Sequence, residues 1–158
     1  MNNKNNIKLV ATDIDGVWTD AKMHYTEEGD YIKSFSTYDG MAVQLLREKN
    51  IETIIITSEN SNIVLQRAKK LKIKNVTIGE KNKLERIKKI CSDKKIDLSE
   101  VAYIGDDIND IEVLKAVGFS ALVSNSPIKE KIRVDYITTR KGGDGAFREF
   151  VDLILEEK

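Results

Sequence analysis

Short continuous apolar runs alternate along this chain with segments of helical periodicity, and this alternation limits the folds that the chain can adopt. Such runs are typical of strands that are buried on both faces of a sheet. Strands that alternate with helices predict a parallel sheet with right-handed crossovers, a doubly wound (Rossmann-like) three-layer α/β/α fold. The expected strands are IKLVAT (7–12), ETIIIT (52–57), NVTI (75–78), VAYIG (101–105), FSALV (119–123) and DYITT (135–139).

The segments between these runs carry their apolar residues at helical spacing. In the last of them, apolar side chains recur at i, i+3, i+4, i+7 and i+8, beginning at Phe147. Ser126 followed by Pro127 resembles a helix N-cap with proline at the first helical position, and predicts one further short helix. The other expected helices cover residues 40–49, 61–72, 80–94, 108–117 and 145–157.

One segment interrupts the alternation between the first strand and the first helix. Residues 16–40, GVWTDAKMHYTEEGDYIKSFSTYDG, are too long for an ordinary connection in such a fold. Two β-rich stretches flank TEEGD, which predicts a β-hairpin over about residues 17–36 with its turn at Glu28 and Gly29. Because it leaves the carboxyl end of the first strand, the hairpin should project beside the crevice where such sheets bind ligands.

Composition excludes several classes of protein. The chain has 26 basic and 26 acidic residues, so no overall charge favours binding to nucleic acid. Its single cysteine, Cys91, permits neither an intramolecular disulfide nor a zinc cluster, and cytoplasmic localisation is expected. No stretch has the length that a bilayer requires, so no membrane association is expected. A chain of 158 residues is expected to form a single domain, residues 1–158.

Chemically distinct polar groups follow the expected strands. Carboxyl ends of parallel strands share one edge of a sheet, so carboxylates, a hydroxyl and an ammonium should converge there. Any one of them alone is better explained as a turn, a cap or a solvated surface residue. Their combination at one edge of the sheet favours a functional site. The residues are Asp13 and Asp15 after the first strand, Thr57 and Ser58 after the second, Lys83 after the third, and Asp106, Asp107 and Asp110 after the fourth.

This set of groups suits phosphoryl transfer. Oxygen ligands from Asp13 and Asp106 fit Mg²⁺, which takes one or two carboxylates and bridges to phosphate. A carboxylate can then act as nucleophile on phosphorus. Thr57 and Lys83 would hold the phosphate oxygens, since positioning and charge stabilisation dominate such catalysis. Asp15 remains as general acid and base.

The motifs DIDGVWTD, IIIITS, NKL and GDDIND resemble, in this order, the four motifs of the haloacid dehalogenase superfamily of phosphohydrolases. The resemblance covers nearly the whole chain. It implies that Asp13 is the nucleophile, that Asp15 is the acid/base and a metal ligand through its carbonyl, and that Asp106 ligates the metal. It also implies that Thr57, with Ser58, and Lys83 bind phosphate. Asp107 and Asp110 match acidic positions that support the metal or the lysine.

More narrowly, the chain resembles the branch without a cap domain that includes 3-deoxy-octulosonate 8-phosphate and nonulosonate 9-phosphate phosphatases. The hairpin region, NSPIKEKIRVDYIT and RKGGDGAFRE carry this resemblance. It implies a homotetramer whose hairpins pack together. It also implies that a glycine-rich C-terminal tail, about residues 140–158, reaches a neighbouring active site.

The residues after the second strand give the only indication of substrate. Octulosonate phosphatases usually have TGR here, whereas this chain has TSE, with Glu59 in place of the arginine. Glu59, Arg67 and Lys70 together resemble the nonulosonate enzymes, in which such residues serve the substrate. A glutamate can accept hydrogen bonds from sugar hydroxyls, and Arg67 or Lys70 can pair with the sugar carboxylate. The expected substrate is therefore a 2-keto-3-deoxy-nonulosonate 9-phosphate (KDN-9-phosphate or N-acetylneuraminate 9-phosphate), with 3-deoxy-octulosonate 8-phosphate as the alternative.

Two other classes of function remain open. A phospho-accepting receiver domain also collects aspartates, a hydroxyl and a lysine at one sheet edge, but its lysine follows a late strand, whereas Lys83 precedes GDDIND. A non-catalytic domain that kept the fold is the third possibility. The complete set of Asp13, Asp15, Thr57, Lys83 and Asp106 argues against it.

Overall fold

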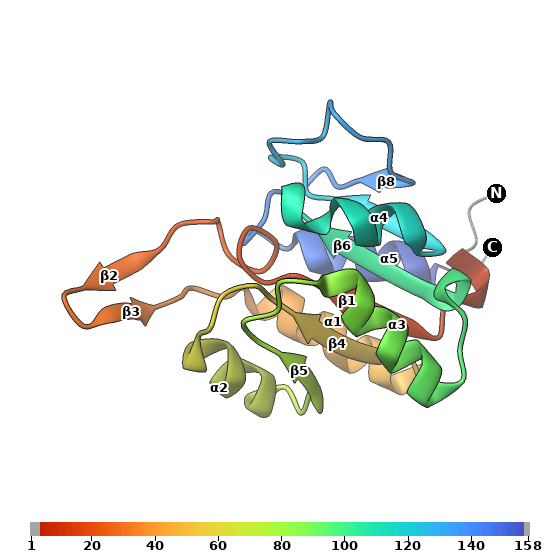
Figure 1. Ribbon diagram of the computed structural model, residues 1–158, viewed down its shortest axis with the longest axis horizontal. Coiled ribbons are helices and arrows are strands. Elements are labelled where there is room, and N and C mark those ends of the chain that lie inside the picture. Colours follow the sequence, from red (N-terminus) through yellow and green to blue (C-terminus); the bar gives the residue numbers. More distant parts are fainter. Residues whose placement is uncertain (1–3, 157–158) are drawn as a thin grey trace.

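The computed structural model describes residues 4–156, and its centre is a parallel sheet of six strands (Figure 1). The strand order is β5-β4-β1-β6-β7-β8, and every neighbouring pair is parallel. From β1 the chain builds first one side of the sheet and then the other, which confirms the doubly wound fold. The strands are β1 (Leu9–Thr12), β4 (Glu52–Ile56), β5 (Asn75–Thr77), β6 (Val101–Gly105), β7 (Phe119–Leu122) and β8 (Tyr136–Ile137).

Helices cover both faces of the sheet and complete the three layers (Figure 1). Side chains alternate along a strand, so Val10 joins one apolar cluster with α1, α2 and α5, whereas Leu9 and Ala11 join a second cluster with α3 and α4. The α-helices are α1 (Thr37–Glu48), α2 (Asn62–Lys70), α3 (Lys83–Lys94), α4 (Ile111–Ala116) and α5 (Ala146–Leu155). Short 3₁₀ turns cover Lys4–Asn6, Leu98–Glu100 and Ile108–Asp110. None of the helices in residues 4–156 is both long and apolar enough to cross a membrane.

The inserted hairpin consists of β2 (His24–Thr26) and β3 (Gly29–Ile32), and it projects away from the sheet (Figure 1). Thr26 pairs with Gly29, so the turn lies at Glu27 and Glu28, and the prediction of a turn at Glu28 and Gly29 was wrong by one residue. Gly29 opens β3 with a φ of +114°, a conformation that glycine adopts without strain.

The short helix expected at Ser126 and Pro127 is not formed. Turns occupy this stretch, and Ser126 Oγ accepts the N–H of Ile128 at 3.2 Å. The same hydroxyl donates to the carbonyl of Asp106 at 2.6 Å. Ser126 therefore stabilises the end of β6 through a long-range contact, which local sequence signals do not reveal.

The core between the sheet and α1 and α5 contains one buried ionisable group that has no opposite charge bonded to it. Asp39 lies in the first turn of α1 and is fully buried. Its Oδ1 accepts the N–H of Arg148 at 2.9 Å, while Oδ2 has no hydrogen-bond partner among residues 4–156. Burial raises the pKa of Asp39 to about 6, although the Arg148 hydrogen bond and the charge of Arg67 act to lower it.

This raised pKa predicts a pH-dependent stability. A carboxyl that ionises at 3.8 when unfolded and at about 6 when folded disfavours the folded state progressively between these two values and by a constant amount above them. The unfolding free energy of Asp39→Asn relative to the unaltered chain should therefore rise by about 2 kcal/mol between pH 4 and pH 7. Urea unfolding of both chains across this range measures it. A difference that is the same at both ends of the range would contradict this assignment.

Candidate active site

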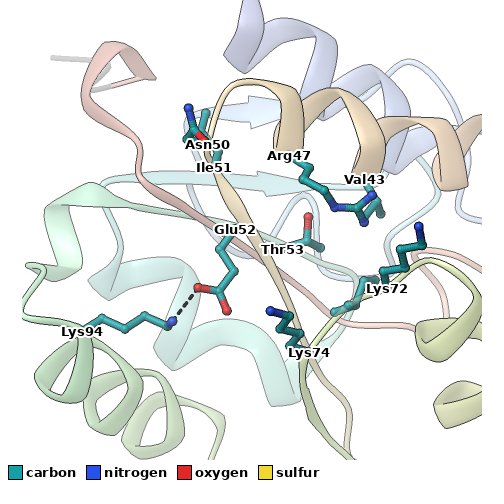
Figure 2. A pocket seen from close by; sticks show the side chains of 10 residues that line it. Val43, Arg47, Asn50, Ile51, Glu52, Thr53, Lys72, Lys74 and Lys94 are labelled. Carbon is teal, nitrogen blue, oxygen red and sulfur yellow. Dashed lines mark ion pairs between the residues drawn. The ribbon is translucent and has the colours of Figure 1, made fainter.

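A cavity of about 480 Å³ lies at the amino end of β4, and none of the predicted site residues lines it (Figure 2). Arg47 donates to the carbonyl of Leu71 there, and Lys94 pairs with Glu52. Arg47 and Lys94 stand in the last turns of α1 and α3, and Leu71 is the C-cap of α2, so these basic side chains stabilise exposed carbonyls and helix dipoles. Stabilisation of helix ends and pairing with Glu52 therefore explain the positive charges of Arg47 and Lys94 at this cavity.

The predicted residues gather instead at the opposite edge of the sheet, around a smaller cavity of about 210 Å³. Asp13, Thr57 and Asp106 directly follow β1, β4 and β6, the three adjacent strands at the centre of the sheet. Asp107 lines the cavity too, and its side chain accepts the N–H of Ile108 at 2.7 Å. The lining residues are Asp13, Asp15, Ala21, Met23, Thr57, Ser58, Glu59, Asp106, Asp107 and Asn109.

Lys83 is the buried cation of this site. It is the first residue of α3, which begins where the Asn82 side chain accepts the N–H of Glu85 at 3.2 Å. Its Nζ lies 2.7 Å from Asp13 Oδ2 and 2.8 Å from Asp110 Oδ1. Although burial lowers it, the two carboxylates raise the pKa of Lys83 above its ordinary value. Lys83 is therefore a fixed positive charge beside Asp13.

Asp110 is fully buried, and both of its carboxylate oxygens are occupied. Oδ1 accepts from Lys83 and from the Tyr103 hydroxyl. Oδ2 accepts the backbone N–H groups of Asp106 at 2.8 Å and Asp107 at 3.3 Å. With four hydrogen bonds in place, Asp110 has no oxygen directed at the cavity. Of the two roles expected for it, this geometry favours support of Lys83 and of the loop after β6.

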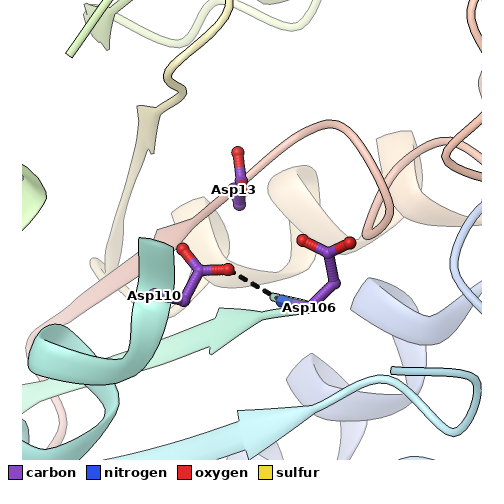
Figure 3. Close-up of side chains that lie close together, drawn as sticks. All are labelled: Asp13, Asp106 and Asp110. Carbon is purple, nitrogen blue, oxygen red and sulfur yellow. Dashed lines mark hydrogen bonds between the residues drawn. The ribbon is translucent and has the colours of Figure 1, made fainter. Parts of the chain in front are cut away.

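Asp13, Asp106 and Asp110 lie close together, and the Asp106 N–H bonds the Asp110 carboxylate (Figure 3). Oxygen atoms of the three residues lie within 4.8 Å of one another. Burial and the charges of Asp13 and Asp110 raise the pKa of Asp106 to about 8. Burial and the charge of Asp110 raise the pKa of Asp13 to about 7, although Lys83 acts to lower it. The two carboxylates repel one another and fit a hard divalent cation that takes one or two carboxylates, such as Mg²⁺.

Glycines let the loop after β1 approach these carboxylates. A Cβ on Gly16, whose φ is +89°, would lie 1.8 Å from Asp106 Oδ2. Behind this loop, a Cβ on Gly142 would lie 1.8 Å from the carbonyl oxygen of Gly16, and the Gly143 N–H donates to Val17 at 2.9 Å. The glycine-rich segment that opens the predicted C-terminal tail thus packs against the active-site loop of its own chain.

Two hydroxyl groups differ in their freedom to bind phosphate. Thr57 Oγ1 accepts the N–H of Glu59 at 3.4 Å, and no acceptor for its own hydrogen is seen within residues 4–156. Ser58 Oγ is already engaged, since it donates to the carbonyl of Glu80 at 3.0 Å and accepts from Asn109 Nδ2 at 3.1 Å. Thr57 can therefore donate to a substrate, whereas the Ser58 side chain braces the loop.

The three residues expected to select the substrate are not brought together within this chain. Glu59 is exposed and lines the cavity. Arg67 instead donates to the carbonyl of Ser36 at 3.3 Å and lies over the ring of Phe35, with Cζ 5.6 Å from the ring centroid. Lys70 is exposed and does not line the cavity.

One residue beside the site, Lys33, has no functional signal in the sequence. Lys33 follows β3, and its side chain is only 1% exposed. Its Nζ donates to Asp15 Oδ1 at 2.8 Å, while Asp15 Oδ2 has no partner among the residues that the structure describes. Burial acts to lower the pKa of Lys33, but Asp15 and Asp30 raise it above its ordinary value. A lysine in a charged, surface-like hairpin carries no sequence signal for this contact.

Fold and site together define a metal-assisted phosphoric monoester hydrolase. A carboxylate pair, a buried lysine and a free hydroxyl meet at the switch point of a doubly wound sheet. The chain belongs to the haloacid dehalogenase-like hydrolase family, whose sequence profile matches residues 47–150. This confirms the resemblance on which the site residues were proposed.

Two of the similar proteins are octulosonate phosphatases. The chain is 37% identical over 151 residues to the 3-deoxy-D-manno-octulosonate 8-phosphate phosphatase KdsC of Haemophilus influenzae, covering 96% of this chain and 84% of that protein. KdsC of Escherichia coli K12 is 35% identical over 150 residues, covering 95% and 80%.

Solved structures show the same similarity. The octulosonate 8-phosphate phosphatase of Moraxella catarrhalis, in complex with magnesium, phosphate and KDO, superposes with a TM-score of 0.92 at 38% identity, covering 97% of this chain and 88% of that one. The cobalt-bound enzyme of H. influenzae gives 0.92 at 37%, covering 97% and 90%. Both solved relatives are named for an eight-carbon substrate, whereas Glu59 suggested a nine-carbon one.

Proposed function

We propose that this chain hydrolyses the phosphate monoester of a 2-keto-3-deoxy sugar acid, and that its substrate is 3-deoxy-D-manno-octulosonate 8-phosphate. The observation that carries the proposal is the Asp13–Lys83–Asp110 network with the Asp106 carboxylate within 4.8 Å of Asp13. Similarity to octulosonate phosphatases over nearly the whole chain supports the substrate. The whole chain would then form one phosphatase domain without a cap, in the cytoplasm, and neither a receiver nor a non-catalytic role is needed to explain it.

Each residue of the site has a part in this reaction. Asp13 attacks phosphorus, and the bond from phosphorus to the sugar oxygen breaks while Asp15 donates a proton to that oxygen. Asp15 then takes a proton from a water molecule, which attacks the aspartyl-phosphate and releases inorganic phosphate. Lys83 and the Thr57 hydroxyl hold the phosphate oxygens during both steps. Magnesium, held by Asp13, Asp106 and the carbonyl of Asp15, would neutralise the charge of the phosphate.

The size of the cavity indicates how the substrate would lie. About 210 Å³ is below the range of roughly 300–1,000 Å³ that encloses most small ligands. The phosphoryl group would fill it, and the sugar acid would extend past Glu59 at its rim. Arg67 and Lys70 of the same chain would not reach this sugar unless the substrate extends over α2.

A nine-carbon acid is the second candidate, because Glu59 lies at the rim where a longer sugar would pass. Phosphate release with Mg²⁺ should be measured in parallel for 3-deoxy-octulosonate 8-phosphate, N-acetylneuraminate 9-phosphate and its deaminated analogue. The highest kcat/KM for the eight-carbon ester would support the proposal. A preference for either nine-carbon ester would replace it with the second candidate, and release from none of the three would refute the sugar-acid assignment.

The hairpin is the proposed surface of assembly into a homotetramer. Tyr25 and Tyr31 are 62% and 60% exposed, and Ile32 is 44% exposed. Exposed apolar groups gathered on a projecting element are typical of interfaces. The double variant Tyr25→Lys, Tyr31→Lys is expected to run as a smaller species in light scattering, because charged side chains do not pack in such an interface. Tyr38→Lys is the control, since Tyr38 is equally exposed at 60% but lies on α1. An unchanged mass for the double variant would contradict the proposed interface.

A further inference from the structure

Lys33 occupies a position that the reaction described above leaves unexplained. Its ammonium group lies 2.8 Å from Asp15 Oδ1 and 3.5 Å from Asp30 Oδ2, and 3.3 Å from the sulfur of Met23. Met23 and Asp15 line the cavity, whereas Lys33 does not. Lys33 is therefore buried directly behind the proposed acid/base and does not touch the substrate itself.

Further polar contacts link Lys33 to strand β3 and to the start of helix α2. Asp30 belongs to β3, and its Oδ2 also accepts the Ser61 hydroxyl at 2.9 Å. Ser61 is buried and immediately precedes α2. A chain of polar contacts thus runs from the start of α2 through the hairpin to Asp15. Because each side chain is held from both sides, the position of Asp15 depends on the position of the hairpin.

The two oxygens of the Asp15 carboxylate differ in their hydrogen bonding. Lys33 is the only side chain that bonds it within residues 4–156, and this bond fixes Oδ1. Oδ2 is itself buried and has no partner among residues 4–156, although Asp15 lines the cavity. An orientation of this kind leaves one oxygen to exchange a proton with the leaving group, and holds the carboxylate in a single rotamer while it does so.

We propose that Lys33 is a positioning residue that fixes Asp15 for proton transfer to the leaving group and ties this function to the hairpin. The proposal rests on the proposed function, in which Asp15 is the general acid. A buried ammonium that served stability alone would be unfavourable, because the free energy of removing Lys33 and its carboxylates from water often exceeds the attraction between them. The orientation of Asp15 supplies a reason for its presence.

The leaving group provides a sharp test of this role. Breaking the phosphorus–oxygen bond of a sugar phosphate produces a strongly basic alkoxide, which needs the proton from Asp15. The same step on 4-nitrophenyl phosphate releases a weakly basic phenolate, which departs without a proton. General acid catalysis is worth about 10²-fold or more. A misplaced Asp15 should therefore slow the sugar ester far more than the aryl ester.

The experiment compares kcat/KM for both esters in four forms of the full chain with Mg²⁺. These are the unaltered chain, Lys33→Met, Asp30→Asn and Lys22→Met. Methionine is an unbranched side chain only one atom shorter than lysine, and it removes the charge. Lys22 is the matched control because it lies in the same insertion, with its side chain 77% exposed, and does not line the cavity.

For Lys33→Met, kcat/KM of the sugar ester should fall by about 10²-fold through kcat, with only a few-fold loss for the aryl ester. Asp30→Asn should shift the ratio of the two esters in the same direction by less, and Lys22→Met should leave it unchanged. Equal losses on both esters, or no loss, in a folded Lys33→Met would overturn the proposal. If Lys33→Met does not fold, an unchanged ratio in Asp30→Asn overturns it instead.

The outcome for Lys33 can be separated from the outcome for the substrate. Turnover of the sugar-acid phosphates by the unaltered chain tests the proposed function alone. If the unaltered chain accepts a different alkyl phosphate, that ester takes the place of the sugar acid in the comparison. The ratio of kcat/KM between the alkyl and the aryl ester then tests the role of Lys33 in the same way.

Discussion

Replacing Asp13 with asparagine is expected to abolish phosphate release, by at least about 10⁴-fold in kcat, while the chain keeps its fold and its mass in solution. Asp13 lies at the end of β1 with Oδ1 accepting the N–H of Ile14 at 2.7 Å and Oδ2 beside Lys83. Asparagine preserves the volume of the side chain but is a poor nucleophile. The loss should therefore fall on the formation of the aspartyl-phosphate and affect alkyl and aryl esters alike.

The matched control for this variant is Asp20→Asn. Asp20 follows Asp13 in the same loop, but its side chain is 58% exposed and it does not line the cavity. Its activity should equal that of the unaltered chain. Steady-state phosphate release, together with light scattering and circular dichroism, measures both variants. An Asp13→Asn chain with normal turnover would show that the proposed mechanism is wrong.

Replacing Lys83 with methionine is expected to damage both stability and activity. Lys83 neutralises Asp13 and Asp110, both of which are buried, and its own side chain is 1% exposed. Removal of one partner from a buried ionic network leaves unpaired charge and costs about 3–5 kcal/mol. The loss of a donor to the phosphate should also lower kcat by about 10²–10³-fold.

Denaturant unfolding and phosphate release separate these two effects. Lys88→Met is the control on the same helix, because Lys88 pairs with Glu85 at the surface and such pairs contribute about 0–1 kcal/mol. Lys83→Arg retains the charge and should lose less stability than Lys83→Met. Equal stability of Lys83→Met and Lys88→Met would contradict the role assigned to the buried network.

The contrast between the two variants follows from the charges at the site. Asp13→Asn removes one of three crowded carboxylates, two of which have a raised pKa. Lys83→Met removes the cation that Asp13 and Asp110 share. A site of this kind should therefore tolerate the loss of a negative charge better than the loss of its positive one, whereas its chemistry requires both.

Several features of the structure could be predicted because they depend on local sequence. All six expected strands are present within residues 4–156, and the apolar period of residues 145–157 matches α5, with Phe147, Phe150 and Val151 fully buried. Apolar runs and apolar periods involve only residues that are close together in the sequence, so they can be recognised without the tertiary structure. The convergence of Asp13, Thr57 and Asp106 was predictable for a second reason: parallel strands bring their carboxyl ends to one edge whatever their side chains are.

Other features depend on contacts that no local pattern records. Ser126 and Pro127 carry a helix-start signal, yet the Ser126 hydroxyl bonds the carbonyl of Asp106 and the stretch forms turns. Trp18, in the hairpin region, is fully buried, and its ring lies 4.9 Å from that of Phe147. Arg67 packs over Phe35 and does not line the cavity.

The sequence by itself determined the sheet, the edge at which the site lies and the chemical groups that meet there, because strand propensity, helical period and the geometry of parallel strands are properties of short segments. Only the tertiary structure decided with which carboxylates the buried lysines pair. Lys83 and Lys33 are both lysines in charged stretches of sequence, but packing buries one between Asp13 and Asp110 and the other between Asp15 and Asp30. Burial removes the water that would otherwise screen these charges, so the ion pairs that matter are fixed by the fold as a whole.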